Sequence, residues 1–102
     1  MINVIENDGT VVLSVAGTDR VTVLNAGELK GVMVEQFAKA EKGILLDLDN
    51  IKFMDSTGIS VLISGVKTSR EKNKHFALRN VKGDVARLLS LMKIDKIIDI
   101  EK

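Results

Sequence analysis

The chain has 102 residues, of which 45% are hydrophobic and 28% charged, and its formal net charge is +1. This is the balance of one small globular domain, and we expect a single domain over residues 1–102. A charge near zero and the absence of Tyr and Trp provide neither attraction to nucleic acid or anionic membranes nor stacking platforms for single strands. Without cysteine, signal peptide or membrane-spanning segment, a soluble cytoplasmic protein is expected.

The N-terminal part of the chain predicts a β-hairpin. Two runs rich in β-branched residues, Ile2–Glu6 and Thr10–Ala16, flank an Asn-Asp-Gly turn at positions 7–9. The following segment, Gly17–Leu24, could extend a strand or cover the core from a loop through its two valines.

A helix is predicted from Ala26 to Lys42. Asn25 is a favourable N-cap residue, and Glu28 stands three positions later, as in a capping box. We expect Gly43 to end this helix. Gly31 inside it costs about 1 kcal/mol relative to alanine, for which close packing against a sheet would be one reason. Apolar residues repeat at helical spacing along the segment: Leu29, Met33, Phe37 and Ala40.

The second half of the chain alternates strands with helices. Ile44–Leu48 is apolar enough to predict a central strand covered on both faces. A helix follows from Ser56 to about Asn73, then a strand at His75–Arg79. Asp84 is expected to cap a third helix, and residues 97–100 form a final short strand or an extended tail.

The expected element order is therefore β-β-α-β-α-β-α-β. Strands joined through helices need crossover connections and tend to be parallel, whereas the hairpin is antiparallel. This predicts an α/β fold with a mixed sheet and helices packed on it.

Two hydroxyls stand where the central strand gives way to the second helix. Ser56 and Thr57 follow the carboxylate of Asp55, and both Asp55 and Ser56 are good N-cap residue types. The free N–H groups and the dipole at a helix start favour an anion. The position therefore suits a phosphate.

The surrounding stretch resembles the phosphorylation site of the STAS family of anti-sigma factor antagonists. Residues 47–59 read DLDNIKFMDSTGI, close to the family pattern D-hydrophobic-S/D-x-V-x-[FY]-[IM]-D-S-[ST]-G-hydrophobic. The resemblance implies a STAS fold over nearly the whole chain, with Ser56 as the phosphoacceptor. Thr57 is the neighbouring acceptor candidate or a first-turn helix residue. Asp55 would cap the helix or contact the kinase, and Gly58 would leave room for a partner or phosphate.

A second family motif, G-[ER]-L-D-x-x-[TN]-A, precedes the first helix in many members. Asn25-Ala26 matches its end and Arg20-Val21 its [ER]-L pair, but Asp19 occupies the glycine position and Thr22 the aspartate position. The family aspartate lies near the phosphorylation site. Thr22 and residues 55–58 are therefore expected to contact the partner. Because threonine replaces the family aspartate, we expect the kinase to recognise this site with a difference in detail.

The resemblance implies a regulatory binding module. The unphosphorylated protein would bind an anti-sigma factor that is also its serine kinase, of the GHKL type, and so release a sigma factor. Phosphorylation of Ser56 would end the binding, and a serine phosphatase of the PP2C type would restore it. No cofactor or metal is expected. The alternative is a STAS subunit of a lipid-transport ABC system or of a stressosome-like scaffold; a neighbouring kinase gene or transporter operon would distinguish them.

Enzyme functions are not expected. The single histidine, His75, lies in a predicted strand away from Ser56 in sequence, and neither a G-x-S-x-G nor a G-x-x-x-x-G-K-[ST] motif is present. Asp47-x-Asp49 after a strand is similar to the start of an aspartyl phosphotransferase motif, but Ile51 replaces its threonine. A receiver domain would need an acidic pair at the end of the first strand, where this chain has its hairpin.

Overall fold

The computed structural model, which describes residues 1–101, begins with the predicted hairpin. β1 (Ile2–Asn7) and β2 (Thr10–Val15) pair antiparallel around a turn of two residues. Asp8 and Gly9 have φ angles of 54° and 88°, the two positive values that a type I′ turn requires. The hairpin prediction is confirmed.

Three further strands extend this hairpin into a mixed sheet with the order β1-β2-β4-β6-β7. β4 (Gly43–Asp47), β6 (His75–Arg79) and β7 (Asp99–Ile100) each pair parallel with the preceding strand of that order. Helices make the crossovers, because parallel strands cannot be joined by a tight turn. The predicted α/β class and mixed sheet are confirmed. The C-terminal segment forms a 3₁₀ turn, η1 (Ile94–Lys96), before β7.

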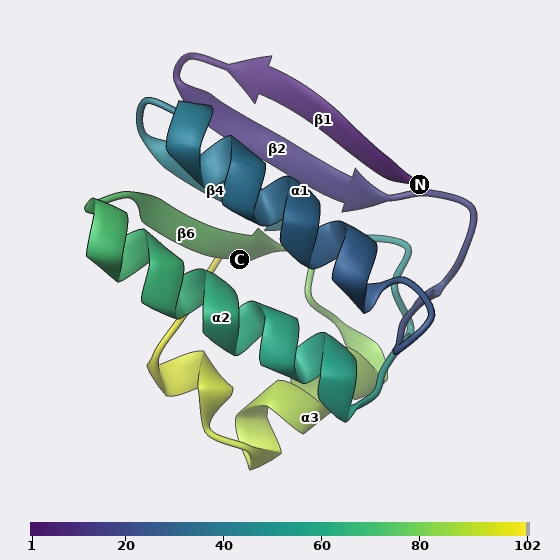
Figure 1. The fold of residues 1–102 in the computed structure, drawn as a ribbon. Helices are drawn as coiled ribbons and strands as arrows, with labels where there is room; N and C mark the ends of the chain where they lie inside the picture. The colour runs from purple at the N-terminus through teal and green to yellow at the C-terminus, as the bar shows by residue number, and fades with distance from the viewer. Residues whose placement is uncertain (102) are drawn as a thin grey trace.

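α1 (Ala26–Lys39) and α2 (Ser56–Lys72) lie side by side on one face of the sheet (Figure 1). α3 (Gly83–Leu91) contacts β5 (Phe53–Met54), the short strand that precedes α2. The buried residues of all three helices join those of the strands in one apolar core.

The prediction that the central strand is covered on both faces needs correction, because one face of β4 is buried and the other is only partly covered. Along β4, Ile44 and Leu46 are fully buried, whereas Leu45 and Asp47 between them are partly exposed. Successive side chains of a strand point to opposite faces, so this alternation distinguishes the two faces of the sheet. An apolar run was compatible with either arrangement.

Two predicted helix boundaries and one predicted capping interaction also need correction. α1 ends at Lys39, because the chain becomes extended at Ala40 (φ −66°, ψ 132°) and Gly43 already belongs to β4. Lys82, rather than Asp84, is the N-cap of α3; Asp84 lies in its first turn. The predicted capping box at α1 is absent: Asn25 stands at the N-cap position, but its side chain makes no capping hydrogen bond.

Gly31 lies on the exposed side of α1, and a Cβ added there would meet nothing within 4 Å. The interpretation that it packs closely against the sheet is therefore wrong.

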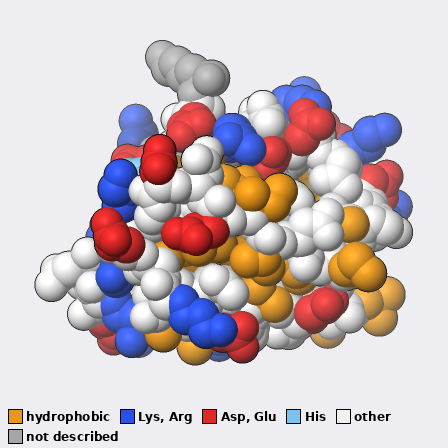
Figure 2. All heavy atoms as spheres, turned by 90° about the horizontal axis from the view of Figure 1, so that it is seen from above, with side chains coloured by type: hydrophobic (Ala, Val, Ile, Leu, Met, Phe, Trp, Pro, Cys, Tyr) orange, Lys and Arg blue, Asp and Glu red, His pale blue; other side chains and the backbone are white. Residues whose placement is uncertain are grey.

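Figure 2 views the molecule from above Figure 1 and shows apolar side chains exposed among acidic and basic ones. β1 is an edge strand, with α1 between it and α2 in Figure 1, and its Val4 and Ile5 are exposed.

Within residues 1–101, no helix combines the length and hydropathy needed to cross a bilayer.

Candidate phosphorylation and partner-binding site

A second, two-stranded sheet brings two distant segments together beside the start of α2. β3 (Arg20–Val21) and β5 (Phe53–Met54) pair parallel. The Arg20 guanidinium carbon lies 5.3 Å from the centre of the Phe53 ring, within the range of a cation–π contact. The backbone N–H of Asp55 extends the pairing by donating to the Val21 carbonyl at 3.2 Å. The segment Gly17–Leu24, for which the sequence allows a strand or a loop, thus contains the short strand β3 and continues into a loop.

The Asp55 carboxylate connects this loop to α2. Its Oδ1 accepts a hydrogen bond from the Gly58 N–H at 2.9 Å, which is an N-cap. Its Oδ2 accepts from the Val23 N–H at 3.1 Å, across 32 positions of sequence. The Gly58 N–H, followed by those of Val23 and Thr57, stabilises the carboxylate and lowers the pKa of Asp55 below its ordinary value of 3.8.

The lowered pKa of Asp55 predicts a pH dependence of stability. Below pH 3.8 the unfolded chain binds this proton before the folded chain does, so stability is present above that pH and lost as pH falls through the folded pKa. Asp55→Asn removes the titration but keeps an oxygen that can accept from Gly58. Denaturant unfolding between about pH 2 and 5 should show a steeper loss for the wild type; parallel curves would contradict the prediction.

Ser56 is the first residue of α2 and is exposed. Its predicted position at a helix start is confirmed, and its role as phosphoacceptor stays a prediction. The Ser56 carbonyl accepts a hydrogen bond from the Ser60 hydroxyl at 2.9 Å, so that hydroxyl faces the first turn. Thr57 is exposed as well, in the second helical position.

Gly58 is buried for a reason internal to the chain. A Cβ at this position would lie 2.7 Å from the Val21 carbonyl oxygen and 3.1 Å from Cγ1 of the same residue. The close approach that demands glycine is therefore made by β3. The expectation that Gly58 leaves room for a partner or phosphate stays a prediction.

Thr22 and Asn25 shape the loop that Asp55 holds. The Thr22 N–H donates to Asn25 Oδ1 at 2.9 Å, and Asn25 Nδ2 donates to the Arg20 carbonyl at 2.9 Å. The Thr22 hydroxyl accepts from the Leu24 N–H at 3.2 Å. Thr22 is thus engaged within its own loop, close to Asp55 through Val23, and the structure brings it into the same corner as residues 55–58.

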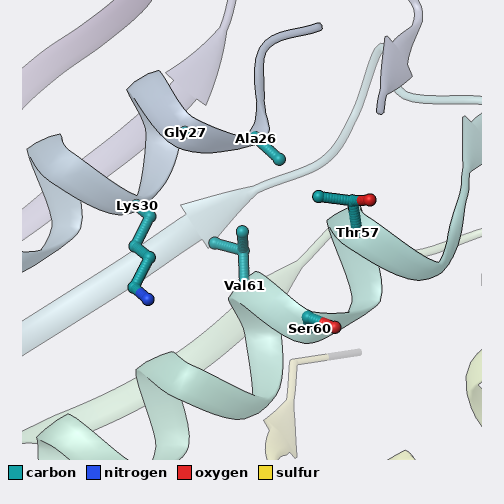
Figure 3. A pocket seen from close by; sticks show the side chains of 6 residues that line it. All are labelled: Ala26, Gly27, Lys30, Thr57, Ser60 and Val61. Atoms are coloured by element: carbon teal, nitrogen blue, oxygen red, sulfur yellow. The ribbon is translucent and has the colours of Figure 1, made fainter. Parts of the chain in front are cut away.

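A shallow hollow of about 180 Å³ lies between α1 and α2 beside Thr57. Figure 3 shows the Thr57 side chain directed toward Ala26 on α1, with Ser60 one turn further along α2. The residues lining it are Ala26, Gly27, Lys30, Thr57, Ser60 and Val61. The surface beside Thr57 is therefore indented, and Lys30 places a cation in the lining of this hollow.

The acidic pair Asp47 and Asp49 has structural partners. Arg79 Nη2 lies 3.0 Å from Asp47 Oδ2, and Asn80 Nδ2 donates to the other oxygen at 3.0 Å. Lys82 Nζ lies 2.8 Å from Asp49 Oδ1. These contacts join the end of β4 to the end of β6 and the segment after it, and they give both carboxylates a structural partner.

His75 lies at the other end of α2 from Ser56, roughly 25 Å along a helix of 17 residues. Its Nδ1 is 3.7 Å from Asp99 Oδ2, and both side chains are exposed. His75 therefore does not reach the Ser56 hydroxyl. Among residues 1–101, no three His, Cys, Asp or Glu side chains gather as a metal site.

Sequence analysis missed Val23 and Leu24 as surface features. Both belong to the loop next to Asp55, and the structure leaves 70% of Val23 and 93% of Leu24 exposed. The signal in the sequence is a pair of apolar residues just before a helix start, and such a pair also suits a strand or a core contact.

The whole chain, residues 1–102, matches the pattern of the STAS domain. The chain belongs to the STAS domain family. The family expected from residues 47–59 is confirmed. The anti-sigma-B factor antagonist of Listeria monocytogenes is 27% identical to this STAS domain over an alignment of 92 positions, and the match covers 82% of this chain and 81% of that protein.

Solved structures share the fold. An anti-sigma-factor antagonist domain protein from Planctomyces limnophilus superposes with a TM-score of 0.85 at 23% identity, over 99% of this STAS domain and 88% of that chain. The anti-sigma factor antagonist SpoIIAA, in its unphosphorylated form, gives a TM-score of 0.74 at 13% identity, over 100% and 88%. At these identities the likeness concerns the fold.

Proposed function

We propose that this STAS domain is an anti-sigma factor antagonist switched by phosphorylation of Ser56. The observation that carries the proposal is the geometry of Ser56: it is exposed at the first position of α2, directly after a carboxylate that caps the helix. The Listeria relative, named as an anti-sigma-B factor antagonist, supports the choice of function.

In the proposed cycle, the unphosphorylated protein binds an anti-sigma factor that is also a GHKL-type serine kinase. The anti-sigma factor then releases its sigma factor. A kinase base accepts the Ser56 proton while the hydroxyl oxygen forms a bond to the γ-phosphorus of ATP and the bond to the bridging oxygen breaks, which leaves phosphoserine and ADP. A PP2C-type phosphatase hydrolyses the phosphoserine and restores binding.

The position of Ser56 decides what the phosphate does to the protein itself. The dipole at a helix start favours an anion by about 0.3–1 kcal/mol at an exposed site. Asp55 carries a negative charge next to it and opposes part of that gain. The fold should therefore tolerate the phosphate, so the switch acts at the surface that the partner contacts.

Incubation with the cognate kinase and ATP should add one phosphate to the wild type and none to Ser56→Ala, because the acceptor oxygen is gone. Ser60→Ala is a matched control, since Ser60 is an exposed serine one turn along the same helix. Intact-mass measurement followed by site mapping gives the result. Full phosphorylation of Ser56→Ala would contradict the assignment, and loss only in Thr57→Ala would move it to the neighbouring hydroxyl.

A further inference from the structure

The loop beside Ser56 presents two apolar side chains to solvent. Leu24 is 93% exposed and Val23 is 70% exposed, although both are large apolar residues. Covering such a side chain with a partner removes apolar surface from water, which favours binding. No other pair of adjacent residues described in this chain combines such size with such exposure next to the start of α2.

This loop is held in place by its own hydrogen bonds. The Thr22 carbonyl accepts from the N–H groups of Asn25 and Ala26 at 3.1 and 2.8 Å, and the Thr22 hydroxyl accepts from Leu24. The Asn25 side chain bridges Thr22 and Arg20. An exposed apolar pair on a preorganised loop loses little conformational entropy when a partner covers it.

The Asp55 carboxylate connects this pair to the phosphorylation site. One oxygen caps the helix that begins at Ser56, and the other accepts from the Val23 N–H at 3.1 Å. The loop and the serine are thus fixed to the same carboxylate, which holds the Val23 backbone next to the residue that precedes Ser56.

We propose that Val23 and Leu24 form an apolar anchor for the anti-sigma factor kinase, and that Asp55 is the positioning residue that holds this anchor beside Ser56. The inference rests on the proposed function and adds to it the residues that supply affinity. The surface of the kinase that receives them is an apolar pocket adjoining its phosphoacceptor site. Thr22, at the family aspartate position, contributes indirectly, because its hydrogen bonds order the loop that carries Val23 and Leu24.

Calorimetric titration of the unphosphorylated protein with the GHKL-type kinase from the same genome tests the anchor. Leu24→Ser should weaken binding about 10- to 100-fold, the range expected when one large apolar side chain no longer becomes buried. Val23→Ser should also weaken binding, because it removes an apolar side chain. Its backbone N–H still reaches Asp55, so the loop should stay in place. Ile5→Ser, on the edge strand β1 with 62% exposure, should bind like the wild type.

Kinase kinetics distinguish an anchor from a structural defect. Leu24→Ser should raise the KM for phosphorylation of Ser56 and leave kcat nearly unchanged, because the side chain contacts the kinase away from the reacting oxygen. If Leu24→Ser had the KM of the wild type, the proposed anchor would be wrong, whereas the proposed function would be unaffected. If the wild type neither bound nor was phosphorylated, the proposed function would fail first.

Asp55→Asn tests the positioning role. Its amide oxygen can still accept from Gly58, but its NH₂ group would face the Val23 N–H, donor against donor. Amide hydrogen exchange at Val23 should become faster, and KM should rise as for Leu24→Ser. Unchanged exchange and unchanged KM would show that the loop needs no carboxylate.

Discussion

The protein phosphorylated at Ser56 is expected to bind the anti-sigma factor kinase about 100-fold more weakly than the unmodified protein, and a Ser56→Asp variant is expected to lose affinity to a smaller extent, both with nearly unchanged thermal stability. Ser56 is exposed at the first position of α2, so the new charge is neither buried nor inside the core. Phosphoserine carries about −1.5 to −2 charges near neutral pH. At a helix start, that charge is favoured, apart from repulsion by Asp55.

The loss of affinity comes from the interface. One partner carboxylate about 5 Å away repels each unit of charge by roughly 3 kcal/mol at an effective dielectric near 20. Each 1.4 kcal/mol is about tenfold in affinity. Even after screening by salt, and with the bulk of a hydrated phosphate added, a decrease of two orders of magnitude is expected for the phosphorylated protein.

Calorimetry of the free proteins and titration with the kinase measure the two halves of this prediction. Ser60→Asp is the matched control, because it places the same charge one exposed turn further along α2. It should weaken binding less than Ser56→Asp does. A large decrease in melting temperature of Ser56→Asp together with intact binding would show that the charge does not act by blocking the surface.

The largest effect on stability is expected from Gly43→Ala. Gly43 has φ +150°, and a Cβ there would lie 2.6 and 2.7 Å from the backbone N and C of His75 and closer still to its carbonyl oxygen. Those atoms belong to the neighbouring strand, so relief requires β4 and β6 to separate. Backbone strain and overpacking together predict a loss of roughly 2–6 kcal/mol, out of a total of about 5–15 kcal/mol for a small domain.

Gly31→Ala is the matched comparison, and the opposite sign is expected. Gly31 lies exposed within α1, where a Cβ meets nothing within 4 Å, so alanine should gain up to about 1 kcal/mol from its helix propensity. Denaturant unfolding of both variants against the wild type gives the two free-energy changes. Equal effects from the two substitutions would refute the packing explanation for Gly43.

Several features of this STAS domain are determined by short-range sequence alone. The Asp8-Gly9 turn defines the hairpin, because only a few residue types accept two positive φ angles. The helical spacing after Ser56 and the capping carboxylate of Asp55 place the serine at the start of α2. In each case the relevant atoms lie within a few residues of one another, so local pattern and local structure agree.

The roles of the two glycines needed the tertiary structure. The sequence predicts that Gly43 ends a helix and that Gly31 packs closely against the sheet. In the fold, Gly43 faces the backbone of His75 in the adjacent strand, and Gly31 faces open space. A glycine signals only that a side chain is absent; the neighbour that makes this necessary is set by which strands become adjacent.

The same reason explains what the sequence left undecided at the candidate site. The residue types that suit phosphorylation, Asp55 and Ser56, are contiguous and could be recognised from their order. The hydrogen bond from Val23 to Asp55 and the carbonyl of Val21 against Gly58 join segments more than 30 residues apart. These contacts arise because β3 pairs with β5, and strands of two residues carry too little periodicity to predict. Only the tertiary structure could therefore show that the loop with its exposed Leu24 stands beside the serine.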